Sequence, residues 1–322
     1  MRSSLALIMF VAGAAAQSPT TGRILVANQQ AASASIVELS TGAVTHIPVG
    51  EGPHEAAISP DGKWGFISVY GIAGKPGNQI AVIDMAEKKV VRTLDLGIYT
   101  RPHGVVPVAG SPLELIVTSE TTQNVIIVNA ETGAVLSVMP TGAQGSHMVA
   151  VQADAKRGYT ANVGSGTMTA LDFATGKATG SVAIAPRSEG IATTTDGSEV
   201  WIGSNTANTV SVVNVAAMKI DTVLSGFSVP YRMAISPNRK LAVIVEAEGN
   251  RISVMDAPAR KLIGTVDVGG APRGVAISPD SKWAFITLGP ENAVVIVDLT
   301  TRAVIARYAV QTAPDGVAYS SR

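Results

Sequence analysis

Cysteine is absent from all 322 residues of the sequence. This absence excludes disulfide bonds, thiolate metal sites, covalently attached c-type haem and a lipid-anchored N-terminal cysteine. Aromatic residues are also scarce, at 4% of the chain, and no segment keeps the 3.6-residue apolar period of an amphipathic helix over three turns. The fold must therefore hold without covalent cross-links, and the apolar pattern does not favour a helical architecture.

The sequence has no excess of charge of either sign. It contains 24 Lys and Arg against 24 Asp and Glu, and no basic block or stripe occurs. This balance argues against a nucleic-acid partner, because binding to a phosphate backbone requires concentrated positive charge. Neither a P-loop nor a dinucleotide-binding glycine fingerprint is present, so the sequence predicts no nucleotide cofactor.

Long hydrophobic runs are missing as well, apart from one near the N-terminus. Residues 1–16 combine a basic Arg2, an apolar stretch from Leu5 to Ala12 and small residues at 14–16. This pattern is typical of a signal peptide, here cleaved before Gln17. The apolar stretch is shorter than the roughly 20 residues that cross a bilayer. We therefore predict an exported protein, periplasmic or secreted, whose mature chain has no membrane span.

What the sequence does contain is a repeated segment. Pro272–Thr287 reads PRGVAISPDSKWAFIT, and Pro53–Ser68 reads PHEAAISPDGKWGFIS. Each copy predicts a short strand, a tight turn built on Ser-Pro-Asp-Gly or a close variant, and a second strand. Aligned copies recur every 42 to 49 residues and begin at Pro53, Pro102, Ser146, Ser188, Pro230, Pro272 and Pro314.

A period in this range with four strands per copy is the signature of a propeller blade. In the copy that begins at Pro230, alternation and turn residues predict strands over 232–236, 241–246, 251–256 and 262–268. Residues 23–49 supply only three strands, and residues 314–320 supply one. We therefore predict a single all-β domain over 17–322, a seven-bladed β-propeller whose closing blade is shared between the N- and C-terminal strands. An insertion, Gly71–Gly77, is expected as a loop in the second blade.

Two segments carry a resemblance to a known family. Thr160–Lys177 reads TANVGSGTMTALDFATGK, and Gly203–Lys219 reads GSNTANTVSVVNVAAMK. Both are similar to repeats of the YVTN family of exported seven-bladed β-propellers, and the resemblance covers essentially all of the mature chain. It implies the fold and the export, but no single function, because related propellers include electron-transfer domains, lactonases and a lyase.

One position of the repeat gathers ionisable residues. The first strand of each propeller blade lines the central channel, so the residue that follows each starting residue belongs to a ring at the channel mouth. The ring holds three of the four histidines of the chain, and consists of His54, His103, His147, Glu189, Tyr231, Arg273 and Asp315. The fourth histidine, His46, lies on a predicted outer strand. Imidazole and carboxylate are ligands of Zn, Mn, Fe and Cu ions. The sequence therefore predicts a divalent-metal site formed by His54, His103, His147 and Glu189.

Other polar residues are expected on the same face and are candidates for binding a ligand: Glu55, Glu120, Tyr231, Glu246, Arg273 and Asp315. Arg273 suits a carboxylate or phosphate group, unless it pairs with its ring neighbour Asp315. Three functions remain open at this stage. The protein is a module that binds a metal ion or small anionic ligand, a metal-dependent lyase or lactonase that uses the same ring, or a scaffold that binds a protein partner on a propeller face. We expect a monomer.

Overall fold

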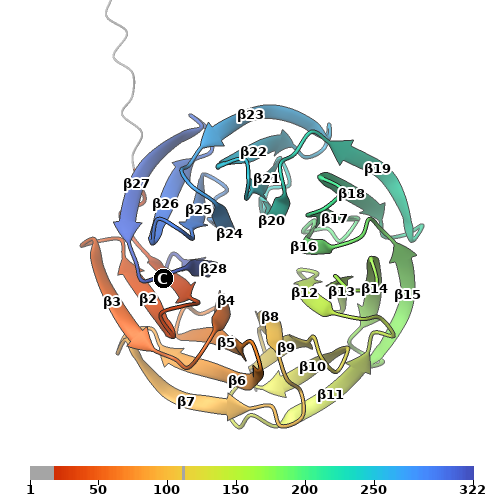
Figure 1. Ribbon diagram of the computed structural model, residues 1–322, viewed down its shortest axis with the longest axis horizontal. Helices are drawn as coiled ribbons and strands as arrows, with labels where there is room; N and C mark the ends of the chain where they lie inside the picture. Colours follow the sequence, from red (N-terminus) through yellow and green to blue (C-terminus); the bar gives the residue numbers. More distant parts are fainter. Residues whose placement is uncertain (1–17, 111–112) are drawn as a thin grey trace, which may run out of the picture.

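The computed structural model describes residues 18–110 and 113–322, so the expected signal peptide lies outside the described residues. The described residues form seven four-stranded antiparallel sheets, arranged as blades around a central axis (Figure 1). This architecture confirms the predicted all-β, seven-bladed propeller. Within the described ranges, no helix is both long and apolar enough to cross a membrane.

The strands of each blade run outward from the axis in chain order, except in the first blade. The innermost strands are β4 (Pro53–Ile58), β8 (Pro102–Val108), β12 (Ser146–Val151), β16 (Ser188–Thr193), β20 (Pro230–Ile235), β24 (Pro272–Ile277) and β28 (Pro314–Ser320). The second strands are β1 (Arg23–Asn28), β5 (Trp64–Ile72), β9 (Glu114–Ser119), β13 (Arg157–Asn162), β17 (Glu199–Ser204), β21 (Leu241–Glu246) and β25 (Trp283–Leu288). The third strands are β2 (Ser33–Glu38), β6 (Lys75–Asp84), β10 (Asn124–Asn129), β14 (Thr167–Asp172), β18 (Thr209–Asn214), β22 (Arg251–Asp256) and β26 (Ala293–Asp298). The outermost strands are β3 (Ala43–Pro48), β7 (Lys89–Asp95), β11 (Val135–Pro140), β15 (Lys177–Ala183), β19 (Lys219–Ser225), β23 (Lys261–Asp267) and β27 (Ala303–Ala309).

The repeated turn between the first two strands of a blade is held by its own side chains. The Ser59 hydroxyl donates to the Asp61 carboxylate at 2.5 Å and accepts from the Trp64 backbone N–H at 2.9 Å. The same Asp61 oxygen accepts from the Lys63 N–H, and Gly62 takes a left-handed φ of 76°. These contacts are the ones that a Ser-Pro-Asp-Gly turn predicts.

The hydrophobic core lies between neighbouring blades. The two middle strands of each blade are buried on both faces, whereas the outermost strand alternates between exposed and partly buried side chains. Leu25 and Ile36 of the first blade pack against Ile67 and Ile83 of the second, for example. Because every blade needs both neighbours to bury its faces, the ring is stabilised as a whole.

The first blade is completed from both ends of the chain. β28 pairs antiparallel with β1, and this register aligns Arg23 with Ser320 and Val26 with Val317. The sheet order is therefore β28-β1-β2-β3. This pairing confirms the predicted closure, and it leaves β1 with a hydrogen-bonded partner on each side.

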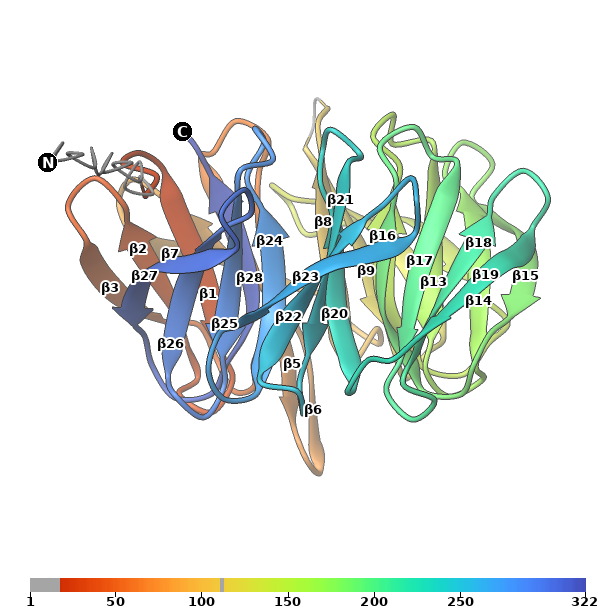
Figure 2. The same ribbon diagram turned by 90° about the horizontal axis from the view of Figure 1, so that it is seen from above.

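The insertion in the second blade is not the loop that we expected from its composition. β5 and β6 continue to pair beyond the blade, with Gly71 opposite Pro76 and Ile72 opposite Lys75. The result is a long hairpin that projects from one face of the ring (Figure 2). Gly74 takes a φ of 76° at its tip, a conformation that glycine adopts without steric cost.

Candidate metal centre at the channel mouth

A backbone irregularity aims the ring residues inward. In each blade the pairing between the two inner strands shifts just after the starting residue, as between Pro102, opposite Ser119, and Val105, opposite Val117. Such a β-bulge inserts one extra residue and turns its side chain away from the regular pleat. The ring residue lies in this bulge in all seven blades.

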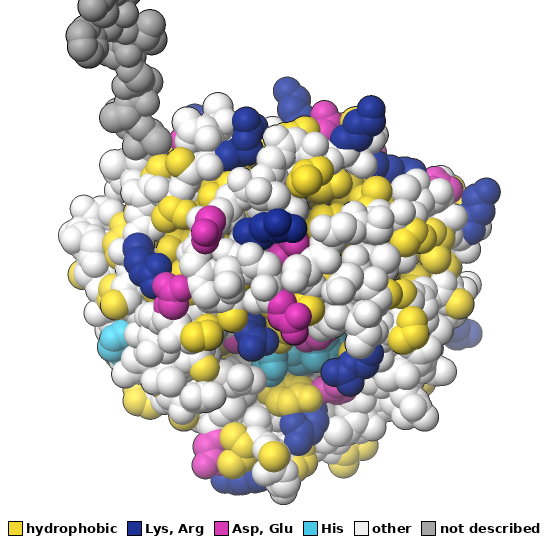
Figure 3. All heavy atoms as spheres, turned by 45° about the horizontal axis from the view of Figure 1, so that its top comes forward, with side chains coloured by type: hydrophobic (Ala, Val, Ile, Leu, Met, Phe, Trp, Pro, Cys, Tyr) yellow, Lys and Arg dark blue, Asp and Glu magenta, His cyan; other side chains and the backbone are white. Residues whose placement is uncertain are grey.

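The three ring histidines converge, as predicted. The imidazole centroids of His54 and His103 are 4.1 Å apart, and those of His103 and His147 are 3.7 Å apart. His103 is fully buried, and the other two are less than a tenth exposed. Figure 3 shows the histidines at the bottom of a hollow with acidic and basic side chains around it. Neighbouring blades therefore bring three imidazoles into direct contact.

Carboxylates surround the outer two histidines. His147 Nε2 lies 2.9 Å from Glu189 Oε1, and its Nδ1 lies 3.5 Å from Glu120 Oε1. On the other side, His54 Nδ1 lies 3.1 Å from Asp315 Oδ2. Burial lowers the pKa of His147, but hydrogen bonds to Glu120 and Glu189 outweigh it and raise the pKa overall. The predicted partner Glu189 thus lies beside the histidines, but it is already bonded to one of them.

His103 has no comparable partner. Neither of its ring nitrogens has a hydrogen bond to any described residue, although its side chain is fully buried. Burial, together with the nearby His147 and His54, holds its pKa well below the usual range, so the imidazole is neutral near pH 7. Burial also lowers the pKa of His54, even though Asp315 opposes it. A buried imidazole with two free nitrogens calls for an explanation, because unsatisfied buried polar atoms are costly.

One set of ligand atoms offers that explanation. His54, Glu55 and His103 each present a nitrogen or oxygen atom, and these atoms all lie within 4.8 Å of one another. The set contains two of the four predicted ligands, with Glu55 in place of His147 and Glu189. Two neutral imidazoles and a carboxylate suit a divalent transition metal.

Arg232 is the residue that sequence reasoning missed. It is only 4% exposed, and its guanidinium donates to Glu55 Oε1 at 2.8 Å and to Glu189 Oε1 at 3.1 Å. Glu55 belongs to β4 and Arg232 to β20, so the ion pair bridges two blades across the axis (Figure 1). The signal was present in the repeat, because Glu55 and Arg232 are the only charged residues that directly follow a ring residue.

A second layer of polar side chains covers the ring. Each member directly follows the second-strand residue that pairs with the starting residue of its blade, and three of them are Tyr70, Glu120 and Asn205. The Tyr70 hydroxyl donates to Glu120, and the Asn205 amide donates to Glu189. Burial, and then the bond to Glu120, raises the pKa of Tyr70 to about 12. Glu120 was predicted from its place in the repeat, whereas Tyr70 and Asn205 share that place and were missed.

The remaining predicted residues divide into two groups. The Tyr231 ring contacts two guanidinium groups, with Arg232 Cζ 4.5 Å and Arg273 Cζ 4.9 Å from its centroid. Tyr231, Arg273 and Asp315 thus belong to the mouth. Glu246 does not contact this cluster: its buried carboxylate accepts from the Ser228 N–H, Arg251 and Ser253. It therefore has a structural role, closing the turn within its own blade.

Comparisons with known proteins support the fold alone. No family model matches the sequence, and no curated protein matches it. Among solved structures, the chain is similar to one described as hydrazine synthase of Kuenenia stuttgartiensis, with a TM-score of 0.73 and 17% identity over 90% of this chain and 99% of that chain. At this identity the likeness carries no statement about activity.

Proposed function

We propose that the protein binds a divalent transition metal ion, Zn, Mn, Fe or Cu, at the channel mouth through His54, Glu55 and His103. The observation that carries this proposal is the fully buried His103, whose two ring nitrogens lack a hydrogen-bond partner in the described part of the chain. A cation bound to one of these nitrogens would give that nitrogen a partner. Ligand atoms of His54 and Glu55 lie close enough to bind the same ion.

The charges at the mouth favour a cation. Among the described residues, four carboxylates meet there around the buried Arg232, and the acids are Glu55, Glu120, Glu189 and Asp315. Arg232 bonds to both Glu55 and Glu189, so it holds the Glu55 carboxylate in place but also lowers its negative potential. The four carboxylates outnumber the two guanidinium groups of the mouth, those of Arg232 and Arg273, so the site retains attraction for a divalent ion.

The residues around the ligands would orient them. Tyr70 packs edge-on against His54 and His103, with ring centroids 5.1 Å and 5.5 Å away. His147 packs against His103 in a tilted arrangement and is itself bonded to Glu189. Partners of this kind set the orientation of ligand side chains and increase metal affinity. A bound metal would supply Lewis-acid chemistry, polarising a carbonyl or phosphoryl oxygen.

Metal analysis of the full protein tests this proposal. We expect protein purified without added metal or affinity-tag histidines to contain about one equivalent of a transition metal, and calorimetry on stripped protein to detect Zn²⁺, Mn²⁺ or Cu²⁺ binding. His103→Gln should weaken that binding by at least about 100-fold. Loss of a residue that only orients a metal ligand lowers metal affinity by about 10- to 100-fold, and loss of a ligand itself should lower it further.

His46→Gln is the matched control, since His46 is exposed on β3 and bonds only to Ser35 among described residues. Circular dichroism should show both variants folded. The proposal fails if stripped protein binds none of these ions, or if the two variants bind them equally well.

A further inference from the structure

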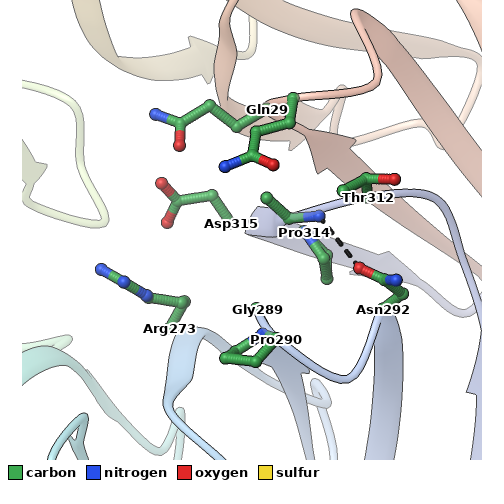
Figure 4. A pocket seen from close by; sticks show the side chains of 10 residues that line it. Gln29, Arg273, Gly289, Pro290, Asn292, Thr312, Pro314 and Asp315 are labelled. Carbon is green, nitrogen blue, oxygen red and sulfur yellow. Dashed lines mark hydrogen bonds between the residues drawn. The ribbon is translucent and has the colours of Figure 1, made fainter.

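A cavity of about 340 Å³ opens beside the ring between the seventh and first blades (Figure 4). It lies where the turn between β25 and β26, the turn between β1 and β2, and the start of β28 come together. Its polar lining side chains come from all three places and from β24: Gln29, Gln30, Arg273, Asn292, Thr312 and Asp315. The volume is within the range of sites for small molecules.

Arg273 is the basic group of this cavity. Sequence reasoning allowed it to pair with Asp315, but that ion pair does not form among the described residues. Asp315 instead lies 3.1 Å from His54, and Arg273 stacks on the Tyr231 ring. That ring is its side-chain partner among the described residues, and its guanidinium has no hydrogen bond to any of them, although the residue is half-buried. An oriented guanidinium with free donors is suited to a bidentate bond with a carboxylate.

The other lining groups suit hydroxyl groups. Asn292 Oδ1 accepts from the Ala313 N–H at 3.2 Å, so its NH₂ group is available to donate (Figure 4). Gln29 supplies a carboxamide that can both donate and accept, and Asp315 supplies a carboxylate that accepts. The apolar lining consists of proline and alanine, and no aromatic ring from the described part of the chain lines the cavity. The chemistry is therefore that of a hydrophilic ligand rather than a flat aromatic one.

We propose that this cavity binds a small hydroxycarboxylate, with its carboxylate on Arg273 and its hydroxyl groups on Gln29, Asn292 and Asp315. The inference goes beyond the metal site, because none of its ligand groups belongs to the cavity. The two sites nevertheless adjoin, since Asp315 lines the cavity and contacts His54. A hydroxycarboxylate bound in this cavity would lie next to the residues that bind the metal. Its polar groups would then be within reach of the ring residues.

Calorimetric titration of metal-stripped protein with D-gluconate tests this proposal separately from metal binding. We expect gluconate to bind, glucose to fail because it lacks the carboxylate, and propionate to bind more weakly because it lacks hydroxyl groups. Arg273→Gln should weaken gluconate binding by about 10- to 100-fold, which is the range for a charge-assisted hydrogen bond. The gluconate affinity of Arg273→Lys should lie between those of the unaltered protein and Arg273→Gln, since lysine keeps the positive charge but cannot form the bidentate bond of a guanidinium.

Arg187→Gln is the matched control, because Arg187 precedes β16 at an exposed position and does not line the cavity. It should bind gluconate as the unaltered protein does. The proposal is overturned if gluconate does not bind at millimolar concentration, if inorganic phosphate or propionate binds as tightly, or if Arg273→Gln behaves like the control. Metal binding by His54, Glu55 and His103 can succeed or fail independently of each result.

Discussion

Arg232 shows how a single residue can hold the channel mouth together. It joins Glu55 and Glu189, which come from different blades, and all three side chains are at least mostly buried. Burial raises the pKa of Glu55, whereas the bonds of Glu189 to His147 and Arg232 outweigh burial and keep its pKa well below the usual range. A buried cation of this kind mainly prevents the cost of leaving its carboxylates unpaired.

We therefore predict that Arg232→Met lowers the free energy of unfolding by about 3–5 kcal/mol in metal-free protein, the usual cost of breaking a buried ion pair. The loss should be smaller with Zn²⁺ present, because the metal replaces part of the lost positive charge and stabilises the folded state by binding to it. Urea unfolding at pH 7, with and without Zn²⁺, measures both effects.

Arg302→Met serves as the control, since Arg302 is exposed, and it should change stability by less than about 0.5 kcal/mol. Equal loss of stability in Arg232→Met with and without Zn²⁺ would contradict the link between Arg232 and the metal site.

The ring residues could be predicted because they share one position of the repeat. His54, His103 and His147 met as expected, since equivalent residues of adjacent blades must lie side by side. The pairing of individual groups could not be predicted in the same way. Whether Glu55 or Glu189 faces His103 depends on the directions of their side chains. Those directions are fixed by ion pairs with Arg232, which comes from another blade.

At the scale of the strand, the approach to each innermost strand requires a particular backbone conformation. The residue before the starting residue has a positive φ in every blade, between 40° and 67°. Only two of these positions hold glycine, and the others are Arg101, Arg187, Val229, Ala271 and Ala313. The left-handed conformation costs a non-glycine residue about 1–2 kcal/mol, and it is least suited to a β-branched one.

Val229→Gly should therefore raise the free energy of unfolding by about 0.5–1 kcal/mol. Glycine removes the cost of a φ of 55°, and its greater freedom in the unfolded chain offsets part of the gain. Thermal unfolding followed by circular dichroism provides the measurement. Val229→Ala keeps a Cβ atom and should gain less. A lower melting temperature for the glycine variant would show that this turn stores no such strain.

Strands were the best-predicted elements, because alternating apolar residues and turn residues mark both their faces and their ends. In the sixth blade, β21 and β22 have the predicted bounds, and β20 and β23 differ by one or two residues. The hairpin at the β5–β6 tip was the exception. Its glycine and proline residues indicated a loop, but the long pairing of β5 with β6 outweighed that local composition.

At the scale of the whole molecule, stability depends on closure by β28. This strand pairs with β1 and packs its Val317 into the cluster that joins the seventh and first blades. Tyr319 stacks on Phe285 with a centroid separation of 4.3 Å. Losing the strand would uncover both the edge of β1 and this apolar cluster.

Deletion of residues 314–322 should therefore abolish cooperative unfolding and increase aggregation, because an open edge and an uncovered apolar face remain. Deletion of Ser321 and Arg322 alone is the control, since both residues follow β28 and are exposed. Calorimetry and light scattering measure the two effects. An unchanged melting curve after the longer deletion would contradict the importance of the closing strand.

The shared blade also has a consequence for the order in which the protein is made. The edge of β1 that receives β28 has no partner until Pro314–Ser320 have been synthesised, long after Arg23–Asn28. At about 5–20 residues per second, that interval lasts roughly 15–60 s. The strands of each of the other six blades are contiguous in sequence, so they can pair with one another soon after they emerge, before neighbouring blades cover their faces. The time taken to translate the rest of the chain, rather than the stability of the finished ring, therefore sets how long β1 stays open to pairing with a strand of another molecule.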